Sequence, residues 1–127
     1  MEQGSQRRGR VLVIDDERSV AVAIQRTLRQ LHDVVICTSS QDALQRLISG
    51  EVFDAIICDL MMPQLSGMAV HAELIKVRPE QAGRMIFLTG GAFTPEARAF
   101  LAAASIVHIE KPFDAQHLRD LVNDRVR

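Results

Sequence analysis

The sequence has only two cysteines, Cys37 and Cys58, among its 127 residues. They have no Cys-x-x-Cys spacing and no histidine cluster beside them, so the pattern does not indicate a zinc site. Both lie inside short apolar runs, which favours buried free thiols. Such use of cysteine is typical of a reducing compartment, and we therefore expect a cytoplasmic protein.

Long apolar runs and a strong net charge are also missing. No run approaches the ~20 apolar residues that a membrane span requires, and the polar, basic start lacks the apolar stretch of a signal peptide. The formal net charge is −1, so we expect no direct binding of nucleic acid. We find no internal repeat or second domain. We interpret residues 1–9 as a disordered lead-in or linker, and residues 10–127 as one domain.

What the domain does contain is an alternation of short apolar runs and amphipathic segments. Five apolar runs, several rich in β-branched residues, predict buried strands: Arg10–Ile14, Val34–Cys37, Val52–Cys58, Met85–Leu88 and Ile106–Ile109. The segments between and after them, around 18–31, 39–48, 68–77, 94–103 and 114–122, predict helices from their spacing and caps. Strand and helix thus repeat five times. This predicts an α/β fold, a three-layer, doubly wound flavodoxin-like sandwich whose parallel five-stranded sheet has the order 2-1-3-4-5.

Polar residues follow four of the predicted strands: Asp15-Asp16-Glu17, Asp59, Thr89 and Lys111. In an open parallel sheet the ligand site lies at the carboxyl ends of the strands, so these residues would share one rim. Crowded carboxylates need a cation, and oxygen ligands suit Mg²⁺. A lysine and a hydroxyl opposite the ion could hold phosphoryl oxygens, and a carboxylate can be the nucleophile. The pattern therefore favours phosphoryl transfer.

Four fragments together resemble the receiver domain of two-component response regulators, over about residues 10–126. They are Val11–Glu17, Asp59–Pro63 with Gly67, Leu88–Gly90 and Lys111–Phe113. Each fragment alone is unspecific, but all four occur in order and each follows an apolar strand. The resemblance implies a signalling domain, not an independent enzyme. It would take a phosphoryl group from a histidine kinase or phosphotransfer domain and then change its binding to partners.

The resemblance also implies roles for individual residues. Asp59 would be the phosphoacceptor, and Mg²⁺, or another divalent cation such as Mn²⁺, would be held by Asp15, Asp16, Asp59 and the Met61 carbonyl. Thr89, with Gly90 beside it, would be the switch hydroxyl, and Lys111 would contact the phosphoryl group. The Lys111–Pro112 bond would be cis. A homodimer would use the face formed by the last two predicted helices and the fifth strand.

One position departs from the family pattern. The aromatic switch residue of the family lies three positions before the lysine, where this sequence has His108. We therefore do not assume the coupling between the switch hydroxyl and an aromatic ring that is usual in the family.

The segments Thr89–Pro95 and Glu110–Asp114 further resemble receivers at the carboxyl end of hybrid histidine kinases.

Other interpretations of the same residues stay open. Asp15 and Asp16 also suit a helix cap, Asp59 a turn, Thr89 a strand end and Lys111 a solvated lysine. A haloacid-dehalogenase-type phosphatase would need an acid at position 61, which is Met. A flavodoxin-like electron carrier would need a Ser/Thr/Gly-rich loop at 15–17. A receiver that docks without phosphorylation is the remaining alternative. His32, His71 and His117 have no ligand spacing, and we expect them on the surface.

Overall fold

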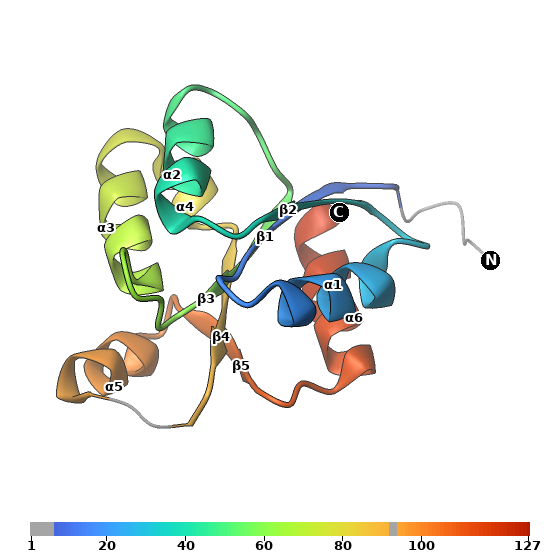
Figure 1. Cartoon of the computed structure of the whole chain (residues 1–127). Helices are drawn as coiled ribbons and strands as arrows, with labels where there is room; N and C mark the ends of the chain where they lie inside the picture. Colours follow the sequence, from blue (N-terminus) through green and yellow to red (C-terminus); the bar gives the residue numbers. More distant parts are fainter. Residues whose placement is uncertain (1–6, 92–93) are drawn as a thin grey trace.

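The computed structural model describes residues 7–91 and 94–127. Its five strands form one parallel sheet in the order β2-β1-β3-β4-β5, which confirms the predicted fold class and topology (Figure 1). The strands are β1 (Arg10–Ile14), β2 (Asp33–Cys37), β3 (Ala55–Asp59), β4 (Met85–Thr89) and β5 (Val107–Glu110). Strands β1 and β3 lie side by side at the centre, so the ends of these two strands meet at the switch point of the sheet.

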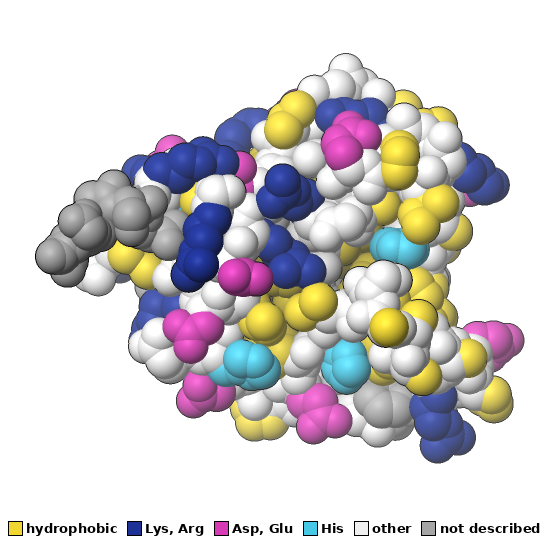
Figure 2. Space-filling view, turned by 180° about the vertical axis from the view of Figure 1, so that it is seen from behind, with side chains coloured by type: hydrophobic (Ala, Val, Ile, Leu, Met, Phe, Trp, Pro, Cys, Tyr) yellow, Lys and Arg dark blue, Asp and Glu magenta, His cyan; other side chains and the backbone are white. Residues whose placement is uncertain are grey.

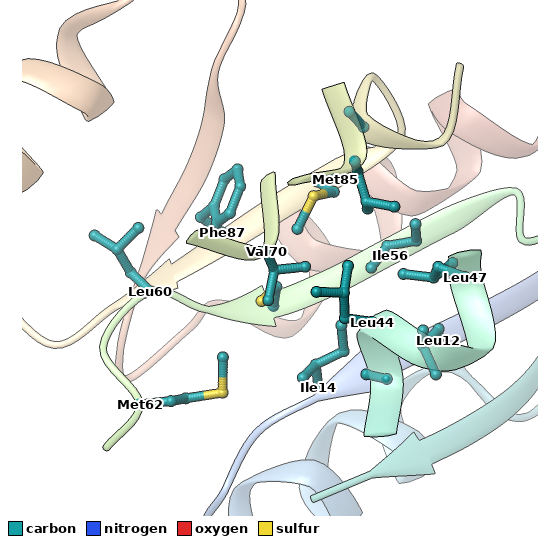
Figure 3. Packing of buried hydrophobic residues seen from close by; sticks show 14 of the residues in the cluster. Leu12, Ile14, Leu44, Leu47, Ile56, Leu60, Met62, Val70, Met85 and Phe87 are labelled. Atoms are coloured by element: carbon teal, nitrogen blue, oxygen red, sulfur yellow. The ribbon is translucent and has the colours of Figure 1, made fainter. Parts of the chain in front are cut away.

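Helices cover both faces of this sheet. One face carries α1 (Arg18–Leu28) and α6 (Ala115–Val126). The other carries α2 (Ser40–Ile48), α3 (Gly67–Val77), the short α4 (Pro79–Ala82) and α5 (Pro95–Ala102). The side chains of β1 alternate between the two layers: Val11 and Val13 pack towards α1 and α6, and Leu12 and Ile14 towards α2. Figure 3 shows the second of these cores, where Ile56 and Phe87 from the sheet meet Leu44, Leu47 and Val70.

The start of the third strand differs from the prediction. The apolar pattern predicted a strand from Val52, but β3 begins at Ala55. The backbone N–H of Phe53 donates to the Gln81 side chain at 2.9 Å, and the Phe53 carbonyl accepts from the same amide at 3.1 Å. Because Gln81 satisfies both backbone groups, Phe53 is buried without joining the sheet. This clamp comes from α4, which the sequence analysis did not predict.

Side-chain caps fix the starts of four helices. Ser39, Ser66, Thr94 and Asp114 each accept a hydrogen bond from a backbone N–H in the first turn of the following helix. These side chains satisfy backbone N–H groups that have no partner within their own helix. Helix α1 has no such cap and ends at Leu28, earlier than predicted, and Leu31 is consequently exposed.

Two histidines do not lie where the sequence analysis placed them. His32 is fully buried, and its ring contacts both the Gly9 amide and the Asn123 side chain. His71 is half-buried against Phe87 and Phe100. The spacing of residues in the sequence cannot show that these histidines are buried, because the residues that pack against each ring lie far away in the chain. His117 is exposed as expected.

Three residues of the lead-in or linker predicted over residues 1–9, namely Arg7, Arg8 and Gly9, contact the folded domain. The rest of the predicted segment, residues 1–6, lies outside the described part. Cys58 is buried and Cys37 only partly so, and both are free thiols. Within residues 7–91 and 94–127, none of the helices combines the length and apolar character that a membrane crossing needs.

Candidate functional site

Three carboxylates meet where β1 and β3 end. Asp15 directly follows β1, Asp16 comes next in the chain, and Asp59 is the last residue of β3. Each offers one oxygen, and these oxygens all lie within 4.8 Å of one another. Asp15 is fully buried and Asp59 is 6% exposed, whereas Asp16 is open to solvent. The parallel register of β1 and β3 is what brings these residues together.

Lys111 reaches the same cluster from the end of β5. Its ammonium nitrogen lies 3.5 Å from Oδ2 of Asp15 and 3.5 Å from Oδ2 of Asp59. The backbone N–H of Lys111 donates to the Thr89 carbonyl at 2.8 Å, which ties the residue to β4. The Lys111–Pro112 peptide bond is cis. The ammonium group of Lys111 thus faces both buried carboxylates, Asp15 and Asp59.

The two buried acids carry raised pKa values. Burial, followed by the charge of Asp15, raises the pKa of Asp59 to about 6, although Lys111 and the backbone N–H of Met61 act in the opposite direction. Burial also raises the pKa of Asp15, against the lowering effects of the Glu17 backbone N–H and Lys111. One lysine therefore does not offset the desolvation and mutual repulsion of the cluster.

The donor set fits a hard divalent cation. Asp15 Oδ1 accepts a hydrogen bond from the Glu17 backbone N–H at 2.9 Å, so this oxygen caps the turn before α1. Its other oxygen, Oδ2, is buried and has no hydrogen-bond partner among the described residues. Within the described part of the chain, this oxygen has only the Lys111 ammonium at 3.5 Å and lies beside two further carboxylates. A bound Mg²⁺ would supply the ligand contact that it lacks. Asp15 therefore does not cap α1: one of its oxygens accepts from the turn before this helix, and the other is left for a cation.

A hollow of about 350 Å³ opens over the cluster, lined by Asp16, Glu17, Asp59, Met61, Gly90 and Lys111. The loop after β3 forms one wall, and Gly67 holds this loop close. The Gly67 N–H donates to the Leu60 carbonyl at 2.8 Å, and a Cβ at Gly67 would lie 2.6 Å from the Asp59 carbonyl oxygen. Gly67 thus lets the loop lie close to the end of β3, beside a hollow whose volume exceeds that of a phosphoryl group.

Thr89 is the last residue of β4, the strand next to β3. It is 1% exposed, and its Oγ1 has no hydrogen-bond partner among the described residues. A buried hydroxyl without a partner costs free energy, so its place beside the acidic cluster needs an explanation. The hydroxyl is a candidate donor to an oxyanion above Asp59.

A family model for the response regulator receiver domain matches residues 11–123. The chain belongs to the response regulator receiver family. Among curated relatives, it is 34% identical over 119 residues to the transcriptional regulatory protein DltR of Streptococcus agalactiae, covering 93% of this chain and 52% of DltR. It is 32% identical over 120 residues to the hydrogenase transcriptional regulatory protein HoxA of Bradyrhizobium diazoefficiens, covering 94% of this chain and 24% of HoxA. The receiver chain thus spans about half or less of these relatives.

Solved receiver structures have the same fold. The receiver domain protein from Clostridium thermocellum has a TM-score of 0.80 at 30% identity, over 92% of this chain and 93% of that one. The family of the chain is shown by the sequence comparisons, and the solved receiver structure has the same fold.

Not every residue of the predicted site lines the hollow of this receiver. Asp16, Asp59, Met61, Gly90 and Lys111 do so. Asp15 and Thr89 are buried and do not line it, while His108 is exposed and lines a different hollow with His117. Glu17 also lines the hollow, although no role was assigned to it. The sequence signal that could have placed Glu17 at the site is its position as the third acid of the run after β1.

Proposed function

We propose that this receiver accepts a phosphoryl group on Asp59 from the phosphohistidine of a histidine kinase or a phosphotransfer domain. An Asp59 carboxylate oxygen would form the new bond to phosphorus while the bond between phosphorus and the donor imidazole breaks. The main support is the clustering of three carboxylate oxygens within 4.8 Å with Lys111 at 3.5 Å from two of the acids. The receiver would catalyse only its own phosphorylation and dephosphorylation.

Asp15, Asp16, Asp59 and the Met61 carbonyl would hold Mg²⁺, or Mn²⁺ in its place. The bound ion supplies positive charge that offsets the carboxylates and the incoming phosphoryl oxygens. Lys111 would hold a phosphoryl oxygen from the opposite side. The raised pKa of Asp59 supports this assignment, because a carboxylate that is unfavourable when ionised gains most from an added cation.

Phosphorylation would change partner binding through Thr89. Its unpartnered Oγ1 would turn to a phosphoryl oxygen, with Gly90 allowing β4 to continue into the next loop. The changed surface would include α5, β5 and α6, where a second copy of the domain could dock. Figure 2 shows acidic, basic, histidine and apolar side chains mixed on one side of the molecule, which suits a protein partner better than nucleic acid. A cytoplasmic location and a place in a hybrid kinase remain part of this proposal.

Intact mass spectrometry tests the proposal. The protein is incubated with Mg²⁺ and a small phosphodonor such as acetyl phosphate, and we expect the gain of one phosphoryl group. Asp59→Asn should gain none, while Asp42→Asn, at an exposed acid of α2, should react like the natural protein. Equal phosphorylation of Asp59→Asn would show that the acceptor is another residue.

The alternative is a receiver that docks on its partner without phosphorylation. The observation in its favour is His108, which is exposed where the family has an aromatic residue. In that case the affinity for the partner, measured by calorimetry, would be the same before and after phosphorylation. Our proposal predicts two different affinities.

A further inference from the structure

His32 is a buried titratable side chain that the phosphoacceptor site does not use. It lies in the turn between α1 and β2 and is fully buried. Its Nδ1 is 3.0 Å from the Gly9 backbone nitrogen, which donates to it. Its Nε2 is 2.7 Å from Oδ1 of Asn123 on α6. The ring thus joins the segment before β1 to the last helix of the domain.

These two contacts fix the protonation state of the ring. A backbone N–H can only donate, so Nδ1 must be unprotonated to accept from Gly9. A neutral imidazole then carries its proton on Nε2, where it can donate to the Asn123 side-chain oxygen. Both hydrogen bonds are satisfied only when the ring is neutral.

The segment that His32 holds is docked along its length, and we call residues Arg7–Gly9 the arm. The Arg8 guanidinium donates to the Arg29 carbonyl at 2.8 Å and pairs with Asp33 at 2.8 Å. The Gly9 carbonyl accepts from the Asp33 N–H at 2.9 Å. A Cβ on Gly9 would lie 2.6 Å from a methyl group of Val126, so the arm runs tightly against the end of α6. The arm is therefore held by α1, β2 and α6 together.

We propose that His32 is a proton-sensitive latch for the arm. When the ring takes a proton from water at Nδ1, two N–H donors face each other and the hydrogen bond from Gly9 is lost. The hydrogen bond from Gly9 and a proton on Nδ1 therefore exclude each other. The backbone carbonyl of His32 accepts from the Arg8 guanidinium at 3.2 Å, so the arm and the turn that carries the ring are also joined beside this bond. Among the described residues, the charged groups that contact the arm are Asp33, which pairs with Arg8, and Asp54, which pairs with Arg7.

Opening of the latch would change how residues 7–9, the segment before β1, are held. With the latch closed, residues 7–9 are bonded to the turn after α1 and to β2, and they pack against the end of α6. With the latch open, the Gly9 N–H loses its acceptor, while the Arg10 N–H keeps its bond to the Asp54 carboxylate at 2.9 Å. A fall in pH would thus loosen the segment before β1, at the opposite end of the sheet from Asp59.

Nuclear magnetic resonance on the full 127-residue chain tests the latch. The His32 ring protons report its protonation, and the Gly9 amide reports docking of the arm. We expect both to change with one midpoint as the pH is lowered, and the protection of the Gly9 amide from exchange to fall on the order of tenfold. A His32 ring that titrates while Gly9 stays unchanged would overturn the proposal, as would unfolding of the domain before His32 is protonated.

A charge variant separates a latch from a merely structural histidine. In Asn123→Asp the carboxylate still accepts from Nε2 but stabilises the imidazolium, so the arm should open at a pH about one unit higher. The matched control is His117→Gln, at an exposed histidine of α6, which should leave the midpoint unchanged. His32→Phe should leave Gly9 unprotected at every pH, and if this variant does not fold, the Asn123→Asp titration still decides. An unmoved or lowered midpoint in Asn123→Asp would refute the latch.

Discussion

Asp15 and Asp59, the two buried acids of the cluster, both carry a raised pKa. Their burial in the sheet removes the water that an ionised carboxylate needs, and each then faces the other. Lys111 reduces this cost, but at 3.5 Å it makes no short hydrogen bond. The acceptor residue is therefore unfavourable when ionised until a cation binds beside it.

The unfavourable ionisation of buried Asp59 gives a prediction for the metal-free protein. The pKa of Asp59 is raised from 3.8 to about 6, so between these values the folded protein keeps a proton that the unfolded chain has released. The free energy of unfolding should therefore fall as the pH rises through this interval. Asp59→Asn should raise the free energy of unfolding by on the order of 1–3 kcal/mol at pH 7.5 in EDTA. Near pH 4 the same substitution should leave the free energy of unfolding unchanged. Urea unfolding at both pH values, with Asp42→Asn as the control, checks this; no gain at pH 7.5 would contradict it.

Gly67 gives a second prediction at the scale of single residues. A Cβ there would lie 2.6 Å from the Asp59 carbonyl oxygen and 3.1 Å from the Leu60 Cα, both backbone atoms of the site. Gly67→Ala should therefore displace the loop after β3 and lower the rate of phosphorylation by acetyl phosphate about tenfold or more. Gly83→Ala is the matched control, because its nearest atom would be at 3.7 Å and its φ is −70°. Equal rates for the two variants would show that the site tolerates the added methyl group.

At the scale of elements, α5 is held to the sheet by an aromatic cluster. The rings of His71 on α3, Phe87 on β4 and Phe100 on α5 meet edge to face, with centroids 5.0–5.9 Å apart. Burial lowers the pKa of His71, which favours its neutral ring in this contact. The cluster thus connects the strand that ends at Thr89 with the two helices beside it.

Phe100→Ala should accordingly loosen α5 more than the rest of the domain. Phe100 is half-buried, so we expect a loss of about 1–3 kcal/mol in the free energy of unfolding. Hydrogen exchange should become faster in α5 and remain slow in β1 and β3. Ile75→Ala, at an exposed residue of α3, is the control. Uniformly faster exchange in all elements would mean that the cluster supports the whole fold instead of α5.

At the scale of the whole molecule, the ends of β1, β3 and β5 must all be in place to form the site. Binding of Mg²⁺ there should therefore stabilise the complete fold. At ten times the dissociation constant the gain is about 1.4 kcal/mol, or roughly 3–6 °C in Tm. Thermal unfolding with Mg²⁺ and with EDTA measures it. Asp16→Asn should lose the gain and Asp42→Asn should keep it; the same gain in both variants would place the ion elsewhere.

The sequence by itself determined the fold class, the strand order and the set of residues at the rim. Short apolar runs of β-branched residues can be buried on both faces only in a parallel sheet, and the polar residues after them must then lie at one edge. The tertiary structure decided what depends on distant partners. His32 and His71 are buried by residues far away in the chain, and Gln81 replaces the sheet for Phe53. Which Asp15 oxygen accepts from the Glu17 N–H and which remains for a cation is likewise fixed only in three dimensions.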